Sequence, residues 1–187
     1  MTILEVLKND HDRIKALLER LINNIDSAPE KRSDLIARIR DEVIPHARAE
    51  EAVLYNSMRK ADGPTDMVYH GFKEHAETEA MLYALETMDT LHVDFKALAQ
   101  KLHDSLVHHV EEEETDLFPQ FKEIFSMSES ELMAEEFNEL KPKIREQNAL
   151  KSSIDLVGNL ISPAVSQLLK DKAPLLSKIE SKLRPSV

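Results

Sequence analysis

The sequence predicts an all-α protein: an up-down-up-down four-helix bundle followed by a C-terminal helical extension. Two observations lead to this prediction. Of the 187 residues only 3 are glycine and 5% are aromatic, which is typical of helical proteins. Apolar residues also recur at helical spacing in four segments that short turn-forming stretches separate, as expected for a bundle with short connections.

The first two helices have recognisable start signals. Thr2 with Glu5 forms a capping box for the first helix, and the apolar stripe of this helix runs over residues 3–25. Residues 27–30 (Ser-Ala-Pro-Glu) predict a turn and a second capping box. Pro45 lies inside the second helix, where the missing N–H and the ring of proline predict a kink.

The last two bundle helices are separated by similar signals. Residues 61–64 (Ala-Asp-Gly-Pro) end the second helix, and Thr65 can cap the third. A break at residues 89–90 leads to the fourth helix, with an apolar stripe over residues 95–117.

Beyond this point the pattern ends, which predicts a bundle domain over residues 1–125 and an extension over residues 126–187. A capping box at 128–131 (Ser-Glu-Ser-Glu) predicts one further helix. Residues 151–187 carry six basic and three acidic side chains. They predict either short helices that pack on the bundle or on a second copy of the chain, forming a homodimer, or a basic amphipathic stretch that contacts a membrane or an acidic partner.

Composition excludes several classes of function. The formal net charge of −11 disfavours nucleic acid as the main partner, because phosphate binding needs a basic face. Without cysteine there is no thiol catalysis, thiolate metal site or disulfide. Residues 1–6 show no secretory signal and no apolar run is long enough to span a bilayer, so a cytoplasmic location without membrane partners is expected.

One pattern occurs twice in the chain. Residues 46–55 and 109–118 both read H-x-x-x-E-E-x-x-L-aromatic, and each is preceded by a lone histidine, His11 or His75. The sequence therefore resembles a duplicated unit. A histidine and a glutamate four residues apart lie on one face of a helix.

Four such faces turned inward would place four imidazoles and two carboxylates in the bundle core. Buried His and Glu need compensation, and nitrogen and oxygen donors without sulfur suit iron, manganese or zinc. Carboxylates from two helices can each bridge two ions, whereas structural zinc prefers four ligands. Neither Glu-x-x-His nor H-E-x-x-H occurs in the chain. The predicted ligands are His11, His46, Glu50, His75, His109 and Glu113.

Neighbouring side chains offer alternatives. His108 with Glu112 repeats the spacing one residue earlier, but the apolar stripe of the fourth helix is in phase with His109. His70 is predicted near the mouth of the site or in solvent. Glu51 and Glu114 lie about 100° from the bridging positions, so they are expected to support the ligands or to face solvent. For Tyr55 core packing is predicted, with a bond to iron or a hydrogen bond as alternatives.

The order H, H-x-x-x-E, H, H-x-x-x-E with its E-E-x-x-L-[FY] tails resembles the hemerythrin-like (HHE) cation-binding domain family over about residues 1–125. The resemblance implies a four-helix bundle that holds two oxo- or hydroxo-bridged iron ions. It implies His11 and His46 on one iron, His75 and His109 on the other, and Glu50 and Glu113 as bridges.

The chain departs from the oxygen-carrying members of that family at two positions. Those proteins have a further histidine four residues after the third-helix histidine, and an aspartate as the second bridge. Here these positions are Glu79 and Glu113. If Glu79 binds metal, an anionic oxygen favours ferric iron; if it does not, both irons can keep an open position. Either case favours redox chemistry or sensing over reversible oxygen carriage.

Three functions are therefore open. The first is a non-haem di-iron protein that binds or senses oxygen, peroxide or nitric oxide, as in oxidative stress. The second is a di-iron enzyme that disproportionates hydrogen peroxide (catalase-like), with Glu79 transferring protons. The third is an iron-responsive interaction protein that folds only when loaded.

Overall fold

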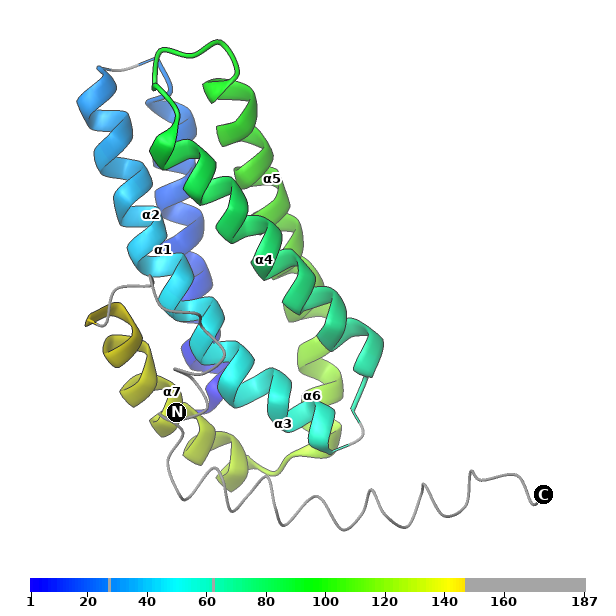
Figure 1. Ribbon diagram of the computed structural model, residues 1–187. Helices are drawn as coiled ribbons and strands as arrows, with labels where there is room; N and C mark the ends of the chain where they lie inside the picture. Colours follow the sequence, from blue (N-terminus) through cyan, green and yellow to red (C-terminus); the bar gives the residue numbers. More distant parts are fainter. Residues whose placement is uncertain (27, 62, 147–187) are drawn as a thin grey trace, which may run out of the picture.

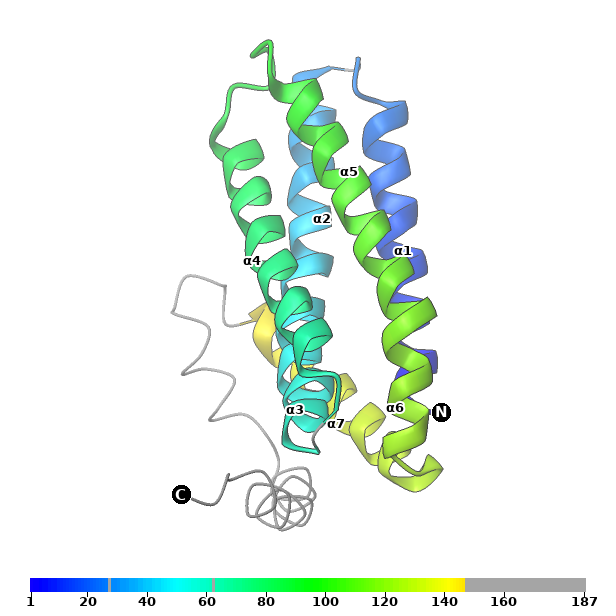
Figure 2. The ribbon, with the colours of Figure 1, turned by 90° about the vertical axis from the view of Figure 1, so that its right-hand side faces the viewer.

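A computed structural model describes residues 1–26, 28–61 and 63–146, and every regular element in these residues is helical. Within the bundle, α1 and α4 each contact both α2 and α5. The end of α1 and the start of α2 lie at the same end of the bundle as the end of α4 and the start of α5 (Figures 1 and 2). The predicted all-α bundle is thus confirmed. Its helices are α1 (Ile3–Asn23), α2 (Pro29–Glu50), α4 (Thr65–Thr87) and α5 (Phe95–Glu112).

Two of these helices continue through a π-helical turn into a short α-helix. After α2 come η1 (Glu51–Tyr55) and α3 (Asn56–Lys60), and after α5 come η2 (Glu113–Leu117) and α6 (Phe118–Ile124). A π turn holds an extra residue and so changes which side chains face the core; such turns are frequent at functional sites. The two turns fall in the two copies of the repeated pattern. The sequence pattern predicts uninterrupted α-helix here, so both π turns differ from that prediction.

The helix starts agree with the sequence in part. The capping box of Thr2 and Glu5 is present. α2 begins after Ala28 without a side-chain cap, and Ser27 lies outside the described residues. Pro64 precedes α4, so Thr65 is the first residue of that helix and not its cap. Pro45 lies inside α2, which continues past it to its end.

The apolar core has two parts with the predicted site between them. One cluster contains residues that precede His11 in α1, such as Leu7, and residues of η1, such as Leu54. The other contains residues on the opposite side, such as Leu18, Ile39 and Phe95. The site histidines therefore lie in a polar layer between two dry clusters, where electrostatic interactions are stronger than in water.

The helix α7 (Met127–Glu146) lies against α1, α2 and η1 (Figures 1 and 2). Its capping box is formed by Ser126 and Glu129 and not by the predicted residues 128–131, because the helix starts two residues earlier than expected. Phe137 and Leu140 of this helix join the first apolar cluster.

The division into residues 1–125 and 126–187 stays a prediction. The short helices predicted within residues 151–187, and their contact with a second copy, lie outside the described residues. Among the described helices, none has the length and apolar character needed to cross a membrane.

Candidate metal centre

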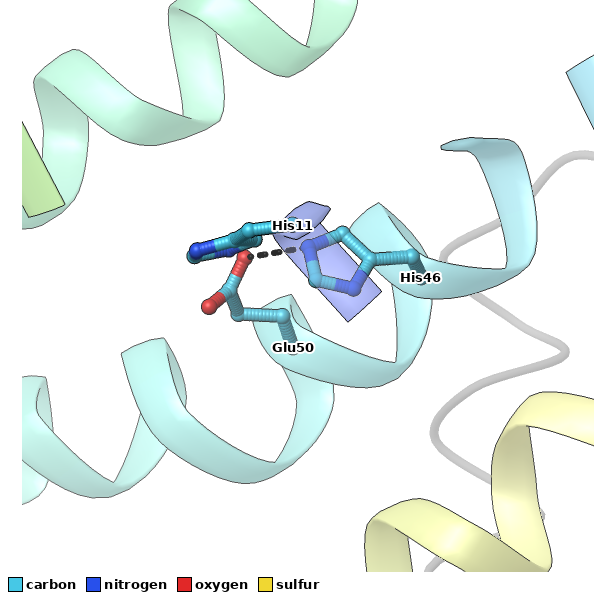
Figure 3. Close-up of side chains that lie close together, drawn as sticks. All are labelled: His11, His46 and Glu50. Carbon is cyan, nitrogen blue, oxygen red and sulfur yellow. Dashed lines mark ion pairs between the residues drawn. The ribbon is translucent and has the colours of Figure 1, made fainter. Parts of the chain in front are cut away.

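Four imidazoles converge in the core, one from each long helix of the bundle. All four residues are at most 4% exposed. The rings form two pairs: His11 and His46 have centroids 5.1 Å apart, and His75 and His109 have centroids 4.8 Å apart. The first pair lies beside the carboxylate of Glu50, and the ion pair between His46 and Glu50 is drawn in Figure 3. The predicted pairing of the histidines thus has a spatial counterpart.

Glu50 and Glu113 each lie between the two pairs. Glu50 Oε2 is 3.5 Å from His46 Nε2 and 3.7 Å from His75 Nε2. Glu113 Oε2 is 3.4 Å from His11 Nε2 and 3.6 Å from His109 Nε2.

Glu50 also belongs to two overlapping groups of possible ligands, one with His11 and His46 and one with His75 and His109. Within each group one ligand atom per residue lies within 4.8 Å of the others. A carboxylate shared by two such groups would be able to bind a cation in either of them.

In each site histidine, Nδ1 forms a hydrogen bond with a carboxylate oxygen. Because an ionised carboxylate only accepts hydrogen bonds, each Nδ1 donates and each Nε2 faces the centre. Carboxylates in this position fix the ring orientation of metal-binding histidines. The four pairs, with their Nδ1–oxygen distances, are His11–Glu114 (2.9 Å), His46–Asp10 (3.1 Å), His75–Glu51 (3.0 Å) and His109–Glu74 (2.8 Å).

These orienting carboxylates follow the sequence repeat. The residue before each lone histidine, Asp10 or Glu74, accepts a hydrogen bond from the H-x-x-x-E histidine of its own copy. The residue after the glutamate of each H-x-x-x-E pattern, Glu51 or Glu114, accepts a hydrogen bond from the lone histidine of the other copy. The roles of Asp10 and Glu74 were missed from the sequence, although an acidic residue before both lone histidines was a signal that could have found them.

The centre contains buried polar atoms that the described residues leave without a hydrogen-bond partner: both carboxylate oxygens of Glu50, Oε2 of Glu113 and Nε2 of His11. Leaving such a group unpaired costs about 1–3 kcal/mol. Cations bound at this centre would give these nitrogen and oxygen atoms a partner. The donor set of nitrogen and oxygen is the one that iron and manganese accept. The residues therefore fit a metal.

Burial and neighbouring charges shift the pKa values of these groups in different directions. Burial, together with the charges of Glu113 and Glu51, raises the pKa of Glu50 well above its ordinary value. Burial opposes ionisation of Glu113 as well, but His109 and His11 hold its pKa well below the ordinary value. Burial and the neighbouring His11 lower the pKa of His46. A metal would therefore compete with a proton for the carboxylate of Glu50.

Tyr55 is fully buried and contacts both halves of the site. Its hydroxyl donates to Glu113 Oε1, and its ring stacks on His75 with centroids 5.3 Å apart. Gly71 allows this position, because a Cβ at residue 71 would lie 2.4 Å from the phenol oxygen. Both core packing and a hydrogen bond at the site, weighed for Tyr55 from the sequence, are present.

This close approach predicts that Gly71→Ala destabilises the protein by about 1–3 kcal/mol, the usual cost of overpacking. The loss is expected although alanine favours helices over glycine by about 1 kcal/mol. Denaturant unfolding measures the effect, with the exposed Ala76→Gly change in α4 as a reference for propensity. A gain in stability for Gly71→Ala would show that Tyr55 does not occupy this position.

A cavity of about 660 Å³ reaches one half of the centre. It runs from the half-exposed His70 to the buried His109 and Glu113. The described residues that line it include five carboxylates and neither Lys nor Arg: Asp66, Glu74, Glu112, Glu113 and Asp116. On the other half, Phe118 stacks on His11 and Phe137 packs edge-on against His46, so both rings cover that pair.

The structure does not bring Glu79 to the imidazoles. Its carboxylate forms an ion pair with Arg48 and is 39% exposed. Arg48 also contacts Glu51, which holds His75, so Glu79 is connected to the site only through other side chains. Its predicted role as a ligand has no support in this geometry.

The structure also distinguishes the two registers considered for the fourth helix. The side chain of His108 is 64% exposed beside Glu112, whereas His109 is buried at the centre.

Comparison with known proteins agrees with this site. Residues 2–121 match the family described as the hemerythrin HHE cation binding domain, whose members bind metal cations. Over 149 residues the chain is 30% identical to a DNA nickase of Nostoc sp. (strain PCC 7120), an alignment that covers 79% of this chain and 41% of that protein. The chain thus spans less than half the length of this relative. No solved structure matches. Because the family match covers residues 2–121, a range that contains all four site histidines, Glu50 and Glu113, the chain belongs to the hemerythrin HHE cation-binding domain family.

Proposed function

We propose that the chain is a non-haem di-iron protein that binds or senses oxygen, peroxide or nitric oxide. His11 and His46 would hold one iron, His75 and His109 the other, and Glu50 and Glu113 would bridge them. Two irons would supply redox-active positions at which a small ligand can bind. The observation that carries the proposal is that each bridging carboxylate lies between one histidine of each pair.

The cavity supports a small uncharged ligand. It reaches the centre beside His109, while Phe118 and Phe137 cover the opposite pair. Its carboxylate lining repels anions, and oxygen, hydrogen peroxide and nitric oxide carry no charge.

Nucleic acid is not a proposed partner. The name of the Nostoc relative gives no reason to assign DNA cleavage to this chain, because the alignment covers 41% of that protein. A formal net charge of −11 also opposes binding to a phosphate backbone.

Metal content tests the proposal first. Elemental mass spectrometry of protein expressed in iron-supplemented medium should find two irons per chain. Glu113→Gln should lower the content of both irons, since this carboxylate faces one histidine of each pair. The exposed Glu111→Gln is the control with the same loss of charge. A single zinc per chain, or no metal, would refute the di-iron proposal.

Ligand binding tests the second part. The anaerobic diferrous protein should change its optical spectrum when nitric oxide, oxygen or peroxide is added. If protein that holds two irons shows no spectral change with nitric oxide, oxygen or peroxide, it binds metal but does not have the proposed function.

Peroxide disproportionation is a second candidate, supported by the groups at the cavity. Glu74 and Glu112 can accept and return protons beside His109, as conversion of two hydrogen peroxide molecules to one oxygen and two water molecules requires. An oxygen electrode should record release of oxygen from peroxide that is lost in His109→Ala and kept in His108→Ala, whose side chain is exposed. Oxygen release no faster than that caused by the same amount of free iron would exclude this enzymatic activity.

A further inference from the structure

A second set of metal-binding side chains lies at the mouth of the cavity. His70 Nε2 is 3.3 Å from Glu74 Oε1 and 3.5 Å from Glu112 Oε2. One ligand atom of each residue lies within 4.8 Å of the others. One imidazole and two carboxylates are donors that Fe²⁺ and Mn²⁺ accept, with water completing the coordination.

This mouth cluster (His70, Glu74 and Glu112) is connected to the buried centre through one side chain. Oε1 of Glu74 faces His70, while Oε2 accepts from His109 Nδ1 at 2.8 Å. The same cavity ends at Glu113, whose Oε2 is buried without a hydrogen-bond partner among the described residues. A cation at the cluster would therefore be one side chain away from a ligand of the centre.

The charge of the cavity favours passage of cations. The described lining residues carry five carboxylates and no Lys or Arg, including Asp66 and Asp116 beside the cluster. A cleft lined by one sign of charge concentrates the opposite ion and raises its association rate by about 10- to 1000-fold.

We propose that the mouth cluster is a third cation site, which takes up Fe²⁺ from solution and passes it to the buried centre. The inference rests on the proposed di-iron function, because that centre receives the ion. His70 is about half exposed, so a bound ion keeps water ligands and can leave again. A transit site needs binding that is weak enough for release.

The rate of iron loading tests this proposal. Metal-free full-length protein is mixed anaerobically with Fe²⁺, and uptake is followed by competition with a coloured chelator. The double variant His70→Ala/Glu112→Gln should load about tenfold more slowly, the lower end of the range for focused charge, and still reach the final iron content of the wild type. The matched control is His92→Ala/Glu111→Gln, because His92 is 51% exposed, as His70 is, and lies outside the cavity.

Loading at the wild-type rate in the mouth variant, or equal slowing in the control, overturns the proposal. Far-ultraviolet circular dichroism of the metal-free variants shows whether they have the wild-type fold.

A second measurement detects the site without iron chemistry. Electron paramagnetic resonance of iron-loaded protein titrated with Mn²⁺ should find one weakly bound Mn²⁺ per chain, absent in the mouth variant and present in the control. No bound Mn²⁺ in the loaded wild type also overturns the proposal. Failure of the di-iron function would be seen separately, as a final iron content below two per chain in the wild type at any loading rate.

Discussion

Replacing Glu50 by glutamine is expected to stabilise the metal-free protein and to abolish its stabilisation by iron. Both oxygens of Glu50 are buried without hydrogen-bond partners among the described residues, and burial raises the pKa of this group well above its ordinary value. A glutamine amide has two N–H donors, and the Nε2 atoms of His46 and His75 lie 3.5 and 3.7 Å from Glu50 Oε2. Replacing the unpaired carboxylate by an amide that can form hydrogen bonds should add about 1–3 kcal/mol to the free energy of unfolding.

With iron bound, the wild type should be more stable than Glu50→Gln. The wild type gains stability from any metal that binds only the folded state, by about 2.7 kcal/mol at a free concentration one hundred times Kd. The variant lacks one bridging carboxylate and should gain little. Denaturant unfolding of both proteins, with and without Fe²⁺ under anaerobic conditions, measures the four values. Equal destabilisation of the metal-free and the iron-loaded protein by Glu50→Gln would mean that Glu50 supports the fold and not a metal. Glu111→Gln is again the control.

The repeated pattern explains how much of the site could be predicted. His11, His46, His75 and His109 could be found because helical periodicity fixes which face of a helix is buried, and each of them lies on that face. Glu50 and Glu113 followed from the spacing of four residues. These are local relations within one helix, so sequence alone contains them.

Other features depend on which helices become neighbours. The pairing of Glu51 with His75 and of Glu114 with His11 joins the two copies of the repeat, and periodicity within one helix does not reveal it. The π turns after Glu50 and at Glu113 escaped prediction because the apolar residues of both segments continue the helical stripes read from the sequence. Glu79 was considered because it stands where oxygen-carrying relatives have a further histidine, and its binding to metal was left open. The structure pairs it with Arg48 of another helix, a contact that position in the sequence cannot indicate.

Replacing Lys141 by methionine is expected to weaken iron binding, although this residue belongs to α7 and contacts no predicted ligand. Lys141 Nζ donates to Asp10 Oδ2 at 2.6 Å, and the same oxygen accepts from His46 Nδ1 at 3.1 Å. Phe137 of the same helix packs against the His46 ring. Loss of groups that orient a metal ligand typically costs about 10- to 100-fold in affinity. We expect about tenfold for Lys141→Met, since Arg13 still pairs with Asp10, and up to 100-fold for Asp10→Asn.

Chelator competition measures these affinities, with Lys143→Met as the control because Lys143 is half exposed and pairs only weakly with Glu139. The coupling must also act in the opposite direction: if Lys141 strengthens iron binding through Asp10, iron strengthens the contact of α7 with the bundle by the same factor. Amide hydrogen exchange in residues 133–144 should therefore slow when iron binds, and slow less in Lys141→Met. Exchange in α7 that does not respond to iron would mean that the helix only covers the bundle. A response would show that α7 is coupled to the metal centre.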